Sequence, residues 1–265
     1  MKSLFFIFVV TGLVIFSSAI GEAALRDGTV LYLAFNEGSG NVAKDLSGNG
    51  NDGKVQGETK WVDGKFGKAL QFDGKTGYVD IASSKSLGFS KAVTVEAWVK
   101  SSADHANYTG LIRKGLHASD RPNFFMLQIK PDGPAGADLV QLVYSHASND
   151  NDYVDSKTGL DIGKWYHLAG VIDPAGGKMT LYFNGNSDVE KVVPADDLKP
   201  DDNPLYIGRG HNGVIEIFNG VIDEVIVYSR ALTAKEIKED MAGINLAVLS
   251  KGKLATAWSS IKNQQ

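Results

Sequence analysis

Short runs of β-branched and aromatic residues, separated by clusters of Gly, Asn, Asp and Ser, recur from Thr29 to Tyr228. This pattern is typical of strands joined by tight turns in a β-sandwich or barrel. The 30 glycines among 265 residues agree with it, because a glycine inside a helix costs about 0.5–1 kcal/mol relative to alanine. The clearest expected strands are Thr29–Phe35, Lys68–Phe72, Tyr78–Ile81, Val93–Lys100, Asn123–Lys130, Leu139–Ser145, Trp165–Ile172, Met179–Asn184, Leu205–Gly208 and Val221–Tyr228.

The segment Val93–Val99 shows which side of one strand is buried. Its odd-numbered positions are aliphatic, whereas Thr94, Glu96 and Trp98 occupy the even-numbered positions. Side chains alternate between the two faces of a strand, so the aliphatic face is expected in a core between two sheets. Asn184-Gly185 follows another alternating run and predicts a tight hairpin, which favours antiparallel pairing.

One short helix is predicted near the C-terminus. Thr233 and Glu236 have the spacing of a capping box, and Gly243 stands where a helix C-terminal cap is expected. Residues 24–243 are therefore expected to form one domain that ends with this helix. Ile244–Gln265 shows no clear helix or strand pattern and is interpreted as a tail that docks on the domain or attaches the protein to another structure.

The first 23 residues have the features of a secretory signal peptide. Lys2 precedes an apolar stretch, and small residues up to Ala23 offer a cleavage site, with Ala19 as the alternative. An uncleaved membrane anchor is the other interpretation, although the apolar run is shorter than the roughly 20 residues that span a bilayer. No later segment is apolar enough to span a membrane. Because the exported chain has no Cys, we expect a bacterial protein that is secreted or periplasmic, with attachment to the cell surface as a further option.

Several function classes are disfavoured by charge and motif context. The formal net charge of -4 and the absence of basic clusters argue against nucleic acid as a partner. Gly48–Gly53 and Gly208–Gly213 match a dinucleotide-binding spacing, but extended rather than helical sequences follow them. The chain shows no zinc-type His spacing, no Gly-x-Ser-x-Gly elbow and no paired-carboxylate glycosidase motif. We therefore expect a protein that is not an enzyme.

The segment that begins at Asp45 suggests a calcium loop. Asp45, Ser47 and Asn49 place oxygen-bearing side chains at alternate positions before Gly50, but the twelfth position is Gln56 instead of Glu. This excludes an EF-hand and leaves two interpretations. The loop either wraps a Ca²⁺ ion or is a turn in which Asp45 bonds to nearby backbone groups.

Taken in order, the glycine-rich pieces of residues 29–243 resemble the laminin-G-like, concanavalin-A-like jelly-roll family. The pieces that carry the resemblance are Leu31–Gly40, Asp45–Gly53, Gly67–Gly74, Val93–Val99, Trp165–Gly170, Leu181–Gly185, Leu205–Gly208 and Phe218–Leu232. The resemblance implies an all-β fold, a two-sheet antiparallel jelly-roll sandwich. It also implies binding of carbohydrates or proteins and a structural calcium, with Asp223 as the matching acid. Asn36 and Asp45 are the expected companion ligands, although Asn36 stands where the family often has Asp.

Seven residues are candidates for ligand binding. Glu96 and Trp98 share a strand face and offer a carboxylate and a stacking ring, if that face is the concave one; burial in the core is the alternative for Trp98 and for His167. Tyr108, Arg113, Lys114 and Arg209 lie near expected loop or strand ends, where a ligand could bind, and the alternative for them is a charged surface that faces solvent. The loops Ser101–Ser119 and Ser145–Lys164 are expected to set specificity.

The expected function is a secreted, non-enzymatic binding module with a structural calcium. Its partner is expected to be a glycan or an extracellular protein. The alternatives are a divergent endo-glycanase of the same superfold and a surface adhesion or structural protein in which the tail is the attachment element.

Overall fold

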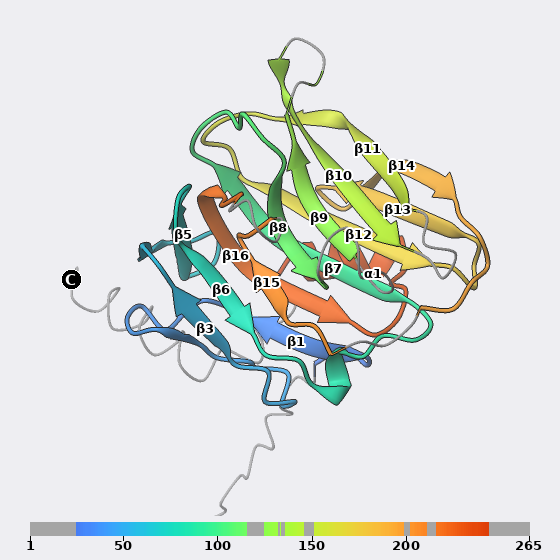
Figure 1. The fold of residues 1–265 in the computed structure, drawn as a ribbon, viewed down its shortest axis with the longest axis horizontal. Helices are drawn as coiled ribbons and strands as arrows, with labels where there is room; N and C mark the ends of the chain where they lie inside the picture. Colours follow the sequence, from blue (N-terminus) through green and yellow to red (C-terminus); the bar gives the residue numbers. More distant parts are fainter. Residues whose placement is uncertain are drawn as a thin grey trace, which may run out of the picture.

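The computed structural model describes residues 25–115, 125–131, 133, 136–145, 151–198, 202–210 and 216–243. Two antiparallel sheets pack face to face as a sandwich, with one short helix behind them in this view (Figure 1). The predicted all-β architecture with one C-terminal helix is therefore confirmed. The expected signal peptide and the expected C-terminal tail lie outside the described residues, so both stay predictions.

The first sheet, called sheet A, has eight strands. Seven follow the order β14 (Asn186–Val192), β13 (Lys178–Phe183), β12 (Tyr166–Asp173), β7 (Val93–Ser101), β16 (Asn219–Tyr228), β5 (Lys68–Asp73) and β4 (Thr59–Asp63), and β1 (Thr29–Leu33) also pairs with β16. Sheet B has the order β11 (Asn151–Leu160), β10 (Asp138–Ser145), β9 (Phe125–Lys130), β8 (Thr109–Lys114), β15 (Leu205–Ile207), β6 (Tyr78–Ile81), β3 (Gly53–Gln56) and β2 (Val42–Ala43). A 3₁₀ turn, η1 (Lys85–Leu87), follows β6, and α1 (Ala234–Met241) follows β16.

The main core lies between the two sheets. As the alternation predicted, Val93, Val95, Ala97 and Val99 of β7 all belong to this core cluster. From sheet B, Val79, Ile81, Leu205 and Ile207 pack in the same cluster. Because these residues alternate along their strands, the residues between them must lie on the outer face of sheet B.

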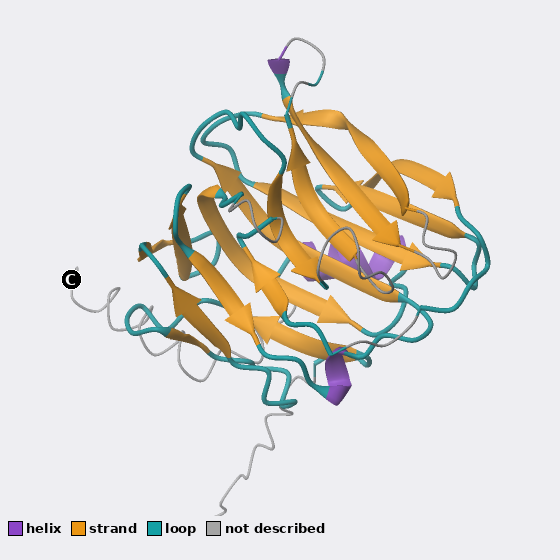
Figure 2. Cartoon of the chain, viewed as in Figure 1, coloured by secondary structure: helices purple, strands orange, loops and turns teal. Residues whose placement is uncertain are grey.

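Helix α1 covers the outer face of sheet A (Figure 2). Its Ile237 packs with Leu232 and with sheet side chains that include Tyr32, Ala169 and Tyr228. The predicted capping box is confirmed: Thr233 Oγ1 accepts a bond from the Glu236 N–H, and Glu236 Oε2 accepts one from the Thr233 N–H.

The predicted hairpin at Asn184-Gly185 is also confirmed. Both residues have positive φ, 48° and 72°, as a type I′ turn requires, and β13 pairs with β14 on either side. Among the described residues, no helix is long and apolar enough to cross a membrane.

The expectation that residues 101–119 and 145–164 are loops was wrong in part, because each range contains a strand. Thr109–Lys114 forms β8, and Asn151–Leu160 forms β11. All six residues of β8 are buried, but the charges of Arg113 and Lys114 made this segment resemble a loop in the sequence. In β11 the many polar residues reflect its position at the edge of sheet B.

Candidate functional site

The seven predicted ligand-binding residues divide between the two sheets. Glu96 and Trp98 of β7 and His167 of β12 meet on sheet A, where His167 pairs in register with Trp98. Arg113 and Lys114 of β8, Arg209 after β15 and Tyr108 before β8 belong to sheet B. Sequence alternation had identified the shared face of Glu96 and Trp98 but not what covers it.

The sheet A group is covered. The Glu96 and His167 side chains are 0% and 3% exposed, with Oε2 and Nε2 3.5 Å apart. Trp98 is 7% exposed and makes edge-on contacts with the His167 and Phe66 rings, while the Lys65 ammonium lies 4.1 Å from its ring centroid. A ligand therefore cannot reach this face in the present arrangement, and the alternative of core burial holds for Trp98 and His167.

Burial dominates the electrostatics of this group. It raises the pKa of Glu96 well above its ordinary value, and the nearby Asp240 carboxyl raises it further. Burial lowers the pKa of His167 to about 4. Both shifts favour the neutral forms, because an isolated charge is costly away from water.

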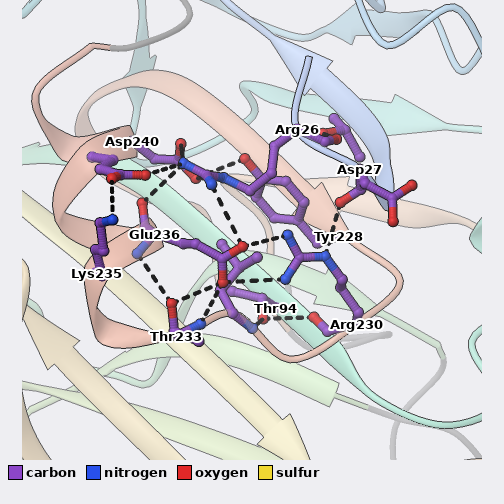
Figure 3. Close-up of polar contacts among 12 residues, drawn as sticks. Arg26, Asp27, Thr94, Tyr228, Arg230, Thr233, Lys235, Glu236 and Asp240 are labelled. Atoms are coloured by element: carbon purple, nitrogen blue, oxygen red, sulfur yellow. Dashed lines mark hydrogen bonds and ion pairs between the residues drawn. The ribbon is translucent and has the colours of Figure 1, made fainter. Parts of the chain in front are cut away.

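Lys65 and Phe66, in the turn between β4 and β5, cover Trp98. Helix α1 lies beside Glu96 and His167 and is joined to the segment before β1 through the polar network in Figure 3. Arg26 Nη2 lies 3.0 Å from Asp240 and 3.1 Å from Glu239. Tyr228 donates its hydroxyl to Asp240, and Arg230 pairs with Glu236 at 2.7 Å. We call Arg26, Tyr228, Glu239 and Asp240 the α1 clasp.

Of the sheet B group, Arg113 and Lys114 are buried, whereas Tyr108 and Arg209 reach the surface. Arg209 and the rings of Tyr78 (β6) and Tyr206 (β15) form a compact cluster, in which all three residues are partly exposed. The ring centroids are 6.1 Å apart, and the Arg209 guanidinium carbon lies 4.7 Å and 5.1 Å from them. Within the described part of the chain, the Arg209 guanidinium has no ion-pair or hydrogen-bond acceptor, and its Nε is buried without a partner. We call Tyr78, Tyr206 and Arg209 the tyrosine–arginine cluster.

Arg113 supports this cluster from β8. Its guanidinium carbon is 5.8 Å from the Tyr206 ring centroid, and it donates to the Gly210 carbonyl. Burial lowers the Arg113 pKa to about 10. Lys114, the next residue, donates to the Asn203 carbonyl and is buried. Tyr108 is 41% exposed and stands just before β8. The structure thus brings Arg113 close to Arg209. The hydrogen bond of Lys114 to Asn203 joins β8 to the segment before β15.

A row of polar side chains extends along the same outer face. Gln128 (β9), Gln141 (β10) and Asp155 (β11) occupy paired register positions. Gln128 donates to Gln141 at 2.6 Å, and Gln141 donates to Asp155 at 2.7 Å. Lys130 pairs with Asp155. Gln128 and Gln141 are buried, so Asp155 and Lys130 are the members of this row that sheet B partly exposes.

Tyr78 and Tyr206 were not predicted as site residues. Tyr78 precedes the core residue Val79, and Tyr206 stands between the core residues Leu205 and Ile207. The alternation could have placed both rings on an outer face, but the pairing of β6 with β15 that joins them is a tertiary contact.

The three expected calcium ligands all act as hydrogen-bond acceptors. Asn36 Oδ1 accepts from the Lys68 N–H and Asp223 Oδ2 from the Phe66 N–H, so both hold the turn between β4 and β5. Asp45 accepts from Tyr32, Ser47 and Asn51 and organises its own loop. In the ranges that the structure describes, no group of three or more His, Asp or Glu is arranged to hold a metal. The present arrangement thus matches the turn interpretation of Asp45, and calcium stays a prediction.

Comparison with known proteins places this fold among binding domains and enzymes. A model of the concanavalin A-like lectin/glucanases superfamily matches residues 73–238, whereas no curated protein matches. Domain 4 of AbnA, a GH43 extracellular arabinanase from Geobacillus stearothermophilus solved with arabinotriose, is 23% identical with a TM-score of 0.62, over 81% of this chain and 98% of that one.

Two further solved structures match part of longer chains. The binding domain of paraclostridial mosquitocidal protein 1 has a TM-score of 0.63 and 18% identity, over 81% of this chain and 52% of that one. Trypanosoma rangeli sialidase has a TM-score of 0.61 and 17% identity, over 84% of this chain and 34% of that one. The chain thus spans about half of the toxin domain and about a third of the sialidase, and these likenesses show the fold alone.

Proposed function

The chain belongs to the concanavalin A-like lectin/glucanases superfamily, and we propose that it is a non-enzymatic module that binds a carbohydrate through the outer face of sheet B. The observation that carries this proposal is the tyrosine–arginine cluster, in which Arg209 has no acceptor within the described residues. Aromatic rings stack on the apolar faces of sugars, and a guanidinium donates to their oxygens.

The partly exposed end of the polar row supports the same proposal. Gln128 and Gln141 are 5% and 7% exposed and bond to each other and to Asp155. Asp155 and Lys130 are partly exposed on the same outer face as the cluster, and their charged groups suit sugar hydroxyls. A face that combines a few aromatic rings with such groups matches an extended oligosaccharide better than a single small apolar ligand.

The relatives add support of a different kind. The AbnA domain was solved with arabinotriose, and the toxin structure is a binding domain. The sialidase carries the same fold in an enzyme, so catalysis is the outcome to be excluded by experiment. We also propose export after cleavage at Ala23, because residues 1–23 have the sequence of a signal peptide.

A glycan array probed with residues 24–265 tests the proposal. We expect binding to a defined set of glycans, and Tyr206→Ala and Tyr78→Ala should each weaken it by about tenfold or more, since stacked rings dominate such contacts. Tyr206→Phe should keep most of the affinity because the ring remains. Trp165→Ala is the matched control: the Lys100 ammonium lies 4.9 Å from its ring, away from sheet B.

Three outcomes would refute the proposal. Glycan binding that is insensitive to both tyrosine variants would place the site elsewhere. Capture of an extracellular protein with no glycan bound would favour the protein-binding alternative. Release of shortened oligosaccharides from the bound glycans would show an enzyme.

A further inference from the structure

A polar hollow lies beside β8 and β16, near the first residue of each strand. Its volume is about 260 Å³, and its polar lining is Asp104, His105, Asn107, Thr109, Glu216 and Asn219. This is smaller than the roughly 300–1,000 Å³ of sites that hold drug-sized ligands. The hollow therefore suits a single sugar unit.

His105 is held rigidly at this hollow. Its Nδ1 lies 2.6 Å from Asp138 Oδ2, and its ring stacks on Phe218 at 5.6 Å with an interplanar angle of 9°. The side chain is 5% exposed, and Nε2 is buried without a hydrogen-bond partner. Because a carboxylate oxygen accepts, Nδ1 is the donor in this bond, and Nε2 is the ring nitrogen left for a ligand.

The charge of the hollow points to a cationic group. Asp104 and Glu216 contribute carboxylates, and no Lys or Arg stands among the described residues that line it. Glu216 interacts with Arg113 of β8, which also contacts the tyrosine–arginine cluster. Asp104 is therefore the carboxylate that we expect to bind a cationic ligand in this hollow. Asn107, Thr109 and Asn219 offer hydrogen bonds suited to hydroxyls.

We propose that this hollow binds an amino sugar with a free amine. The ammonium group faces Asp104 and donates to His105 Nε2, and the amide and hydroxyl side chains bind the ring hydroxyls. This site is separate from the tyrosine–arginine cluster and does not depend on the function proposed for it.

Titration with glucosamine, followed by ¹⁵N–¹H spectra of the His105 ring, tests the proposal. We expect the Nε2 signal to shift and saturate at millimolar ligand, and N-acetylglucosamine, which has no charge, to bind at least about tenfold more weakly. Asp104→Asn should weaken glucosamine binding by about tenfold. Its matched control is Asp27→Asn, an exposed Asp beside Arg230 in Figure 3.

A second variant separates binding from folding. His105→Asn keeps an N–H near the Nδ1 position for Asp138 but removes the Nε2 acceptor, so it should remain folded and lose glucosamine binding, read from backbone amide shifts. Equal affinity for glucosamine and N-acetylglucosamine, or unchanged affinity in Asp104→Asn, would overturn the proposal. Equally tight binding of Nα-acetyl-lysine amide would overturn the assignment to a sugar.

Discussion

Tyr228 donates its phenolic hydroxyl to Asp240 at 2.7 Å, and this bond links the last strand of the sandwich to the helix that follows it. Asp240 also receives Arg26 from the segment before β1. One buried carboxylate thus holds together two segments that are more than 200 residues apart in the sequence.

Replacing Tyr228 by Phe should destabilise the fold. The change removes one donor to a buried carboxylate while keeping the ring, and a hydrogen bond to a charged group contributes about 1.5–3 kcal/mol. Urea unfolding should show a lower midpoint with an unchanged slope. Tyr166→Phe, which removes a hydroxyl bonded to the exposed Asp161, is the control and should change the midpoint little. Equal effects of the two variants would contradict the role of the α1 clasp.

Glu96→Gln should change how stability depends on pH. Glu96 has a raised pKa in the folded protein because of burial and Asp240, with Glu236 adding and Arg26 opposing. At a pH above the ordinary Glu pKa, the folded state therefore still holds a proton that the unfolded state has lost. The contribution of protonated Glu96 to the free energy of unfolding is complete below the ordinary Glu pKa and is lost as pH rises toward the raised pKa. Gln cannot ionise, so the variant should keep its stability as pH rises. Parallel urea midpoints for the variant and the unmodified protein from pH 4 to 8 would contradict this.

His167→Gln should act in the opposite direction. Burial lowers the folded-state pKa of His167 from 6.5 to about 4, so its contribution is complete above pH 6.5 and is lost as pH falls toward 4. A shift of this size corresponds to at most about 3 kcal/mol. The variant should lose less stability than the unmodified protein between pH 6.5 and 4. A variant that is equally acid-sensitive would assign that sensitivity to other groups.

The calcium hypothesis makes a separate prediction. If Asn36, Asp45 and Asp223 hold Ca²⁺, thermal melting with added calcium should exceed melting with chelator by several degrees, because a ligand that binds only the folded state stabilises it. Asn36→Asp adds a carboxylate and should enlarge the difference. Identical melting curves in calcium and chelator for both proteins would reject the hypothesis.

Sequence alone predicted the sandwich and its helix because their signals are local. Alternation along Val93–Val99 identified the buried face, and the capping box fixed the start of α1 at Thr233. The strand β8 was missed because Arg113 and Lys114 are charged, although Gly210 and Asn203 carbonyls accept their hydrogen bonds and allow their burial.

The candidate site was harder to predict than the fold. Glu96 and Trp98 do share a face, but whether that face is open depends on α1 and on the turn between β4 and β5, which come from distant parts of the chain. The tyrosine–arginine cluster depends on the pairing of Tyr206 with Asp80, and thus on strands more than 120 residues apart. Local patterns carry no information about such contacts.

The α1 clasp has a mechanical consequence. Thr29, the first residue of β1, pairs with Tyr228, the last residue of β16, in an antiparallel arrangement. A force that pulls these two ends apart would open the pair one hydrogen bond at a time, which is the weakest direction for such a ladder. Arg26 and Asp240 lie outside this pair and are joined to each other, so they would take the load first. We therefore expect the clasp to set the force at which the module begins to open under tension.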